Sequence, residues 1–467
     1  MSDKSKAQLL EEELVYKKKS YYETASAEEK AAIFDYAKGY KAFLDVAKTE
    51  REAVTEGVRM AEANGYTPYA FGEKLNAGDK RYYNNRGKNL FLIRKGSEPV
   101  DKDGIRILAA HVDAPRIDLK QNPLYESANM AFFKTHYYGG IRKYQWAAIP
   151  LALHGVVIKK DGTEVNVKIG EDEDDPVFYI SDLLPHLAQN QNTKPLGTAF
   201  TGEDLNILVG GMPYDDADVS DKIKLNVLAV LHEKYGIEER DFQTSELSLV
   251  PAFRARDIGF DRALIGAYGH DDRVCAYPEM TAMFEADDSA HTVLTILADK
   301  EEIGSEGNTG MKSRLLLDII EDIAACDGVS GAAVRAHSMC LSADVAAAYD
   351  PNFAEVFEKN NSSMLSCGAT MAKYTGARGK SGTSDASAEF VGYIRTLFEK
   401  AGVPWQTAEL GKVDIGGGGT VAMYIANLNI DTVDIGAGVI AMHAPYEVVS
   451  KCDVYALHKA FYAFCKG

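Results

Sequence analysis

The sequence has few of the features that mark secreted, disulfide-stabilised or membrane-spanning proteins. Its 467 residues include only six cysteines, which show no CxxC pair and no regular framework, so free thiols in a reducing compartment are the simpler interpretation. The most apolar stretch, 146–153, is too short to cross a bilayer. The first residues contain no apolar segment typical of a secretory signal. We therefore expect a cytoplasmic protein.

Basic residues are scarce relative to acidic ones. The chain has 51 Lys and Arg against 69 Asp and Glu, a formal net charge of −18. Nucleic acids and anionic membranes attract basic surfaces, so this charge argues against both as partners. It does not exclude an acidic substrate, because a local site can oppose the overall field. The length and the 46% hydrophobic residues indicate two or three globular domains.

Strand-like and helix-like segments alternate along much of the chain. The first 65 residues read as helix, with a capping box formed by Ser26 and Glu29. Strands are predicted at 89–94, 105–110, 292–298 and 432–435, and later helices at 312–325, 386–401 and 454–465. This alternation predicts an α/β fold with a mixed, largely parallel sheet flanked by helices.

The middle of the chain has a different pattern. A hairpin is predicted over 156–169, with its turn at Asp161–Gly162, and helices are predicted at 181–190 and 222–235. We interpret this region as an inserted, mostly β domain. The predicted division is a catalytic domain at 1–118 and 248–467, interrupted by the insert at 119–247.

Acidic residues and histidines gather just after the apolar segments. In open α/β sheets, ligands bind beyond the carboxyl ends of the strands, so these positions are candidates for a site. Five motifs carry them: HVDAPR at 111–116, GHDDR at 269–273, DKEEIGS at 299–305, SAD at 342–344 and AMH at 441–443.

Some of these motifs have an ordinary structural explanation when taken singly. A lone histidine at a strand end is more often structural, and two aspartates after a glycine more often form a surface turn. Glu301 and Glu302 are harder to explain, because burying paired carboxylates is costly without a metal ion or a catalytic role. Together the motifs supply two histidines, three acidic ligands and a spare glutamate, the inventory of a dinuclear zinc or cobalt hydrolase.

In their order and spacing, these motifs resemble the family of aspartyl aminopeptidases and vacuolar aminopeptidase I, in its bacterial branch. The resemblance covers essentially the whole chain, including the insert. It implies a zinc aminopeptidase fold in which the insert is a dimerisation domain. It also implies an enzyme that removes N-terminal residues from peptides. It also implies a homo-oligomer built from dimers, as large as a dodecamer.

The same resemblance implies the metal ligands. His111 and Asp344 would complete one metal site, Glu302 and His443 the other, and Asp271 would bridge the two. Two divalent ions are expected, with zinc as the first choice and cobalt or manganese as alternatives, since carboxylate-rich sites accept all three.

Further roles also follow from the resemblance. Glu301 would be the general base, Asp113 would orient the imidazole of His111, and the peptide bond after Asp271 would be cis. His186 would reach the active site of a neighbouring subunit, and Lys373 would lie near the substrate. The loop at 414–420 departs from the pattern of animal members, so the preference for an acidic or a neutral N-terminal residue stays open.

Two other functions remain as alternatives. One is a related metal hydrolase that acts on acylated amino acids, against which the aminopeptidase-type insert argues. The other is a non-catalytic scaffold particle that retains the fold. Loss of the base or of a ligand would be expected of a scaffold, and all six positions are intact here.

Overall fold

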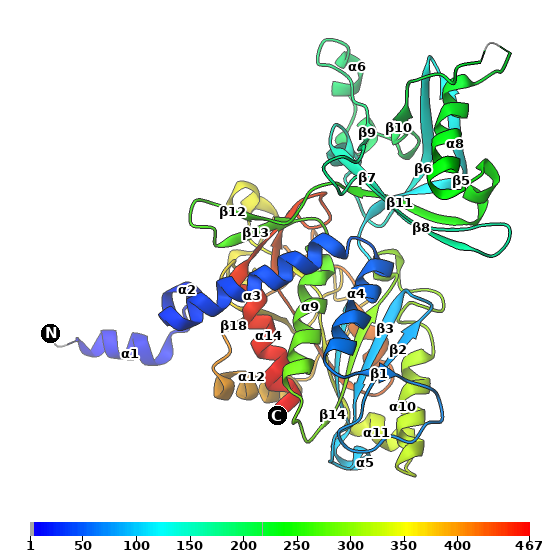
Figure 1. The fold of residues 1–467 in the computed structure, drawn as a ribbon. Coiled ribbons are helices and arrows are strands. Elements are labelled where there is room, and N and C mark those ends of the chain that lie inside the picture. Colours follow the sequence, from blue (N-terminus) through cyan, green and yellow to red (C-terminus); the bar gives the residue numbers. More distant parts are fainter. Residues whose placement is uncertain (1–3, 217) are drawn as a thin grey trace.

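Two bodies make up the structure, a computed structural model that describes residues 4–216 and 218–467 (Figure 1). The larger body contains a nine-stranded sheet in the order β1-β2-β3-β14-β4-β15-β19-β17-β18. In that order the strands span Thr67–Pro68, Lys80–Asn85, Asn89–Arg94, Thr292–Ala298, Ile105–His111, Met339–Ser342, Asp431–Gly436, Ala369–Ala372 and Trp405–Thr407. The central strands β14, β4, β15 and β19 run parallel, so their carboxyl ends lie at one edge.

Helices cover both faces of this sheet, because its central strands are apolar on both sides. In β4, Leu108 and Ala110 pack with side chains of α3, α4, α9, α12 and α14, whereas Ile107 and Ala109 pack with α10, α11 and α13. The first set of helices spans Ala27–Val46, Glu50–Ala63, His270–Glu285, Ala388–Ala401 and Lys451–Lys466. The second set spans Leu315–Cys326, Gly331–His337 and Ala422–Ala426.

The smaller body is a closed antiparallel barrel that projects from the larger one (Figure 1). Its seven strands follow the order β11-β5-β6-β10-β9-β7-β8, and an additional pairing of β11 with β7 closes it. From β5 to β11 they span Arg116–Ser127, Met130–Tyr138, Pro150–Ile158, Glu164–Ile169, Phe178–Ile180, Ile207–Gly210 and Ser245–Pro251. The helix α8 (Lys222–Tyr235) packs on this barrel, which has its own apolar core around Trp146 and Phe133.

Small elements complete the chain. A five-stranded sheet, β12-β13-β21-β20-β16, spans Arg256–Ile258, Leu264–Ala267, Glu447–Ser450, Gly438–Ile440 and Ala346–Ala347. The short helices α1, α2, α5, α6 and α7 span Lys6–Leu14, Tyr21–Thr24, Val100–Asp103, Gln189–Asn192 and Leu196–Ala199. Within the described residues, no helix has the length and apolar composition needed to cross a bilayer.

A buried polar network connects the two bodies. The ammonium of Lys48, just before α4, donates to Glu171 at 2.6 Å and to the carbonyl of Pro251 at 2.9 Å. His154 on β7 lies between Glu52 of α4, at 2.9 Å, and Glu171, at 3.0 Å. These groups are largely buried, so each depends on its partner for its hydrogen bonds. The contact between the two bodies is therefore stabilised by specific charge-assisted hydrogen bonds.

The α/β fold with a largely parallel sheet is confirmed, and so are the strands at 89–94 and 292–298 and the capping box of Ser26 and Glu29. The helix predicted at 181–190 is wrong. Only Gln189–Asn192 is helical there, because Pro185 interrupts the segment and residues 181–187 are exposed, with no core to stabilise a helix.

Candidate metal centre

The predicted site residues lie at the carboxyl edge of the central parallel strands. His111 is the last residue of β4, and Asp344 follows β15 by two residues. Glu301 and Glu302 open a single 3₁₀ turn, Glu301–Ile303, three residues after β14. Because β4 pairs in parallel with both β14 and β15, these side chains emerge at the same edge.

Two further residues reach this edge from outside the nine-stranded sheet. Asp271 lies at the start of α9, where the peptide bond to Asp272 is cis, as the resemblance implied. His443 lies in the turn between β20 and β21. The site thus combines segments that are more than 300 residues apart in the chain, from His111 to His443.

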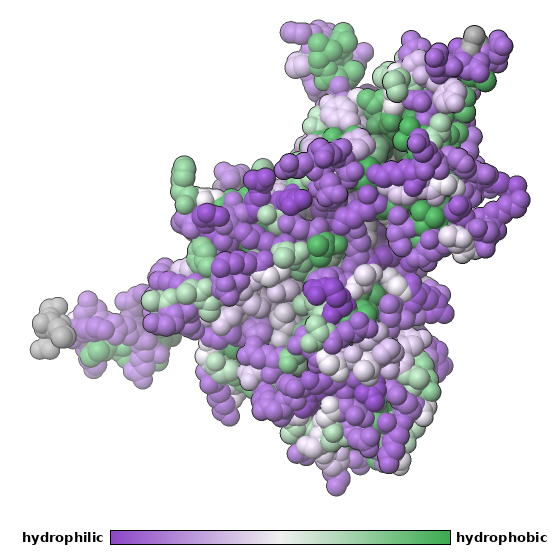
Figure 2. Space-filling model, in the orientation of Figure 1, coloured by the Kyte–Doolittle hydropathy of each residue, from purple (hydrophilic) through white to green (hydrophobic). Residues whose placement is uncertain are grey.

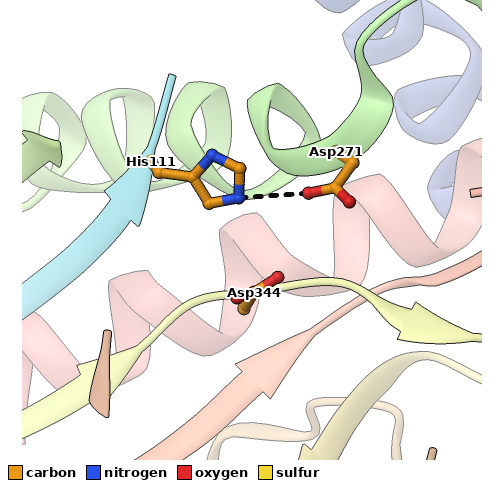
Figure 3. A group of neighbouring side chains, drawn as sticks. All are labelled: His111, Asp271 and Asp344. Atoms are coloured by element: carbon orange, nitrogen blue, oxygen red, sulfur yellow. Dashed lines mark ion pairs between the residues drawn. The ribbon is translucent and has the colours of Figure 1, made fainter. Parts of the chain in front are cut away.

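Asp271 belongs to two groups of side chains that could each hold a metal ion. In the first, ligand atoms of His111, Asp271 and Asp344 lie within 4.8 Å of one another (Figure 3). In the second, the same is true of Asp271, Glu302 and His443. Oδ1 of Asp271 is 3.1 Å from Nε2 of His111, and Oδ2 is 3.1 Å from Nε2 of His443. Each oxygen of this carboxylate therefore faces one group, the arrangement that a bridging ligand needs.

The donor atoms of these groups fit divalent metal ions. Oε1 of Glu302 is buried and has no hydrogen-bond partner among the described residues, and buried Oδ1 of Asp271 faces only the imidazole of His111, without hydrogen-bond geometry. Buried polar atoms without a partner are rare and call for an explanation. Imidazole nitrogens and carboxylate oxygens are the ligands of zinc, and cobalt or manganese accept the same set.

The electrostatics of the site also favour bound cations. Burial raises the pKa of Glu302 and of Asp344 well above the ordinary carboxyl range, and nearby acidic groups, Asp271 and Asp272 among them, add to the effect. Burial likewise raises the pKa of Glu301 to about 7, and the carboxylates of Asp271 and Asp113 contribute. A bound dication would relieve this repulsion and lower these pKa values.

Asp113 lies behind both groups and belongs to neither. Its carbonyl oxygen is 3.0 Å from Nδ1 of His111, and its Oδ1 is 3.3 Å from the same nitrogen. With Nδ1 engaged in this way, Nε2 is the nitrogen left to face Asp271. The carboxylate of Asp113 also accepts the backbone N–H groups of Glu301 and Glu302, at 3.1 and 3.2 Å. One buried side chain therefore fixes the turn that carries both glutamates.

Glu447 supports the site from β21, a role that the sequence analysis missed. Its carboxylate accepts the backbone N–H of Asp271 at 3.1 Å and that of His443 at 2.6 Å. Burial raises its pKa to about 8, and Asp271 adds to the shift. The only available signal was an acidic residue at the start of a short strand, whereas Glu301 and Glu302 were singled out by following the end of one, so the search after strand ends passed over Glu447.

Two predicted substrate-binding residues are not brought into these groups. His186 is exposed in the loop between β9 and α6 on the barrel. Lys373 follows β17 and forms an ion pair with Asp385. Because β17 is antiparallel to β19, the chain at Lys373 has run away from the edge that carries the candidate ligands. His270 points elsewhere, as expected, with its ring between the hydroxyl of Tyr40 and the carbonyl of Ile265.

Known proteins match this chain over nearly its whole length. A family model described as aminopeptidase I zinc metalloprotease (M18) matches residues 43–465. A relative from Clostridium acetobutylicum, named Probable M18 family aminopeptidase 1, is 49% identical over 440 residues, which are 92% of this chain and 94% of the relative.

Solved structures agree with this match. The crystal structure of an M18 family aminopeptidase from Thermotoga maritima shares 41% identity with a TM-score of 0.92, over 97% of this chain and 99% of that one. A dodecamer of mApe1 from S. cerevisiae shares 23% identity with a TM-score of 0.73, over 92% of this chain and 96% of that one, a likeness of fold. The predicted resemblance to bacterial relatives of aminopeptidase I is confirmed, and the chain belongs to the M18 family of zinc metallopeptidases as an aminopeptidase, a peptide hydrolase.

Proposed function

We propose that this aminopeptidase binds two divalent metal ions and uses Glu301 as the general base. The observation that carries the proposal is the placement of Asp271, whose two oxygens face two separate ligand groups. His111 and Asp344 would complete one site, and Glu302 and His443 the other. Zinc is the first choice, with cobalt or manganese as alternatives set by availability.

When bound, the metal ions supply Lewis acidity, which polarises the scissile carbonyl and lowers the pKa of a water molecule so that it can lose a proton and attack at neutral pH. Glu301 belongs to neither ligand group, so its carboxylate is free to take the proton of that water and pass it to the leaving amine. Asp113 holds Glu301 through its backbone N–H and holds the ring of His111. The acidic side chains around the site would also attract the free α-amino group of a peptide.

Peptides with an acidic or a neutral first residue are the proposed substrates. Lys373 and Lys380 both pair with Asp385, so this surface trio keeps one net positive charge that could attract an acidic side chain. Its position away from the edge that carries the candidate ligands leaves room for a neutral preference instead. Comparing substrates decides between the two.

The barrel is the proposed dimerisation domain, corresponding to residues 119–247, with the catalytic domain at 1–118 and 248–467. A hollow of about 490 Å³ on its surface is lined almost wholly by apolar side chains, and green patches mark this region in Figure 2. Contiguous exposed apolar surface marks interfaces. We propose that this chain forms a homo-oligomer built from dimers and as large as the dodecamer of the yeast relative. In this assembly, His186 of one subunit would reach the active site of a neighbouring subunit.

The experiment is hydrolysis of Asp-, Glu-, Leu- and Lys-p-nitroanilides by zinc-loaded protein, with a chelator-treated sample as the control. Chelator-sensitive release led by Asp or Glu, with two zinc ions per chain by elemental analysis, supports the acidic preference. Release led by Leu keeps the mechanism and assigns a neutral preference. Two bound metals with no release, but with cleavage of N-acetyl amino acids, would replace the proposal by an acyl-amino-acid hydrolase. Two bound metals with no cleavage of either substrate would indicate the scaffold alternative.

We place the protein in the cytoplasm, in keeping with its six unpaired cysteines.

A further inference from the structure

Three consecutive residues of the barrel, Tyr138, Gly139 and Gly140, lie against the candidate metal centre. Tyr138 is the last residue of β6, and the two glycines follow it directly. All three belong to the barrel by their place in the chain, yet Tyr138 and Gly140 form hydrogen bonds with Asp113 and His443 of the larger body. Through this segment, the barrel contacts the candidate metal centre.

The hydroxyl of Tyr138 donates a hydrogen bond to Oδ2 of Asp113 at 2.8 Å. The guanidinium of Arg116, opposite Tyr138 in the β5–β6 pair, stacks on its ring with the carbon atom 3.9 Å from the ring centre. Burial raises the pKa of Tyr138, and the Asp113 carboxylate raises it further, so the phenol stays protonated and keeps its donor. Since Asp113 holds both His111 and Glu301, the phenol is linked indirectly to one ligand and to the proposed base.

The two glycines lie against the second ligand group. The carbonyl of Gly140 accepts a hydrogen bond from Nδ1 of His443 at 2.8 Å, which leaves Nε2 facing Asp271 and Glu302. A Cβ atom added to Gly140 would lie 3.4 Å from the same Nδ1. Gly139 has a φ of +75°, and a Cβ atom there would lie 3.3 Å from Oε2 of Glu302. At Gly139 a side chain would therefore crowd Glu302, whereas at Gly140 a methyl group would make an ordinary contact with His443.

We propose that the segment Tyr138–Gly140 is a positioning element through which the barrel fixes the geometry of both metal-ligand groups. The inference rests on the two metal sites proposed above and assigns to the barrel a role beyond oligomerisation. Hydrogen bonds behind metal ligands fix the ring orientation and the basicity of those ligands, and removing one commonly weakens metal binding or activity by about 10- to 100-fold.

The test compares Tyr138→Phe with Tyr137→Phe. The first variant removes the hydroxyl that holds Asp113 and keeps the ring that stacks on Arg116. The second removes the hydroxyl of the adjacent, exposed tyrosine on the same strand, which forms no hydrogen bond with the site in the described part of the chain and serves as the matched control. Zinc affinity is measured by competition with a chelating dye, which reports on positioning whether or not the protein hydrolyses a given substrate.

The expected result for Tyr138→Phe is about 10-fold or greater loss in zinc affinity at one site or in kcat, with KM within about twofold of wild type. The metal-free protein should unfold within about 4 °C of wild type, since one hydrogen bond is lost. Tyr137→Phe should match wild type in every measurement. Wild-type zinc affinity and kcat in Tyr138→Phe would overturn the proposal, and so would a large drop in the metal-free unfolding temperature with affinity and kcat unchanged.

Gly139→Ala provides a second variant should Tyr138→Phe fold poorly. Its added methyl group would lie 3.3 Å from Oε2 of Glu302, closer than ordinary contact, so weaker zinc binding at the site that contains Glu302 is expected, and two wild-type affinities would contradict the proposal. The two proposals fail differently. Absence of chelator-sensitive hydrolysis in wild type counts against the proposed function, whereas equal zinc affinity and kcat in variants and wild type count against the positioning role.

Discussion

Replacing Glu301 by glutamine removes a proton acceptor and preserves the size of the side chain. Glu301 lies beside both ligand groups without belonging to either, and its backbone N–H stays bonded to Asp113. The variant should therefore keep two metal ions and lose turnover. General-base catalysis is worth about 10² to 10⁴ in rate, or about 3 to 5 kcal/mol of transition-state stabilisation, so kcat should fall at least 100-fold.

The pH dependence offers a second measure of the same variant. The base must be deprotonated to act, so wild-type kcat/KM should rise with pH through the pKa of Glu301 and level off above it. Burial sets that pKa at about 7 in the metal-free protein, and bound cations would shift the rise to lower pH. The rise should be absent from any residual activity of Glu301→Gln.

The assay is initial-rate hydrolysis of the best p-nitroanilide from pH 5 to 9, together with metal analysis of each sample. Glu306→Gln, an exposed glutamate five residues along that pairs with Lys312, is the matched control and should keep wild-type rates. Glu301→Gln that retains more than about a tenth of wild-type kcat would refute the assignment of the base. Loss of metal from this variant would instead make Glu301 a ligand.

Three other perturbations test separate parts of the structure. Asp271→Asn should bind fewer than two zinc ions per chain by elemental analysis, because it replaces the charged carboxylate that both groups share with a neutral amide. Two tightly held ions in this variant would contradict the bridging role. Glu447→Gln should keep the fold and lower zinc affinity about 10-fold, since it disturbs the carboxylate that accepts from Asp271 and His443, and an unchanged affinity in a dye competition would remove it from the site. His154 tests the contact between the bodies. Burial alone would lower its pKa, but Glu171 and Glu52 outweigh burial and raise it. Its contribution to the free energy of unfolding should be complete below pH 6.5 and decline as the pH rises through the raised value, a slope that thermal melts should lose in His154→Leu.

The sequence predicted the parts of the fold that depend on local pattern. β14 was predicted at its observed bounds because it consists of apolar residues and β-branched threonines, and the five motifs were found because charged side chains follow such strands. The helix predicted at 181–190 failed because its apolar residues have no surface to pack on. The local sequence pattern predicts a helix or strand correctly where the residues of that segment themselves determine its structure.

The supporting residues of the site could not be predicted in this way. Gly140 holds His443 across 303 residues of chain, and only its backbone carbonyl takes part, so its identity gives no chemical signal. Tyr138 looks like any aromatic residue at the end of a strand. Their roles exist only once the barrel has met the larger body, which is a matter of tertiary contact.

The carboxylate of Asp271, divided between two sets of ligands, would make the two proposed metal positions electrostatically dependent on each other. Removing one cation would leave its share of negative charge to the other, so the remaining ion should be held more tightly than it was in the pair. Stepwise removal by a chelator should then pass through a long-lived form with a single ion. Refilling that form with a different divalent ion would give a defined mixed-metal enzyme, in which each position can be followed by its own spectroscopic signal.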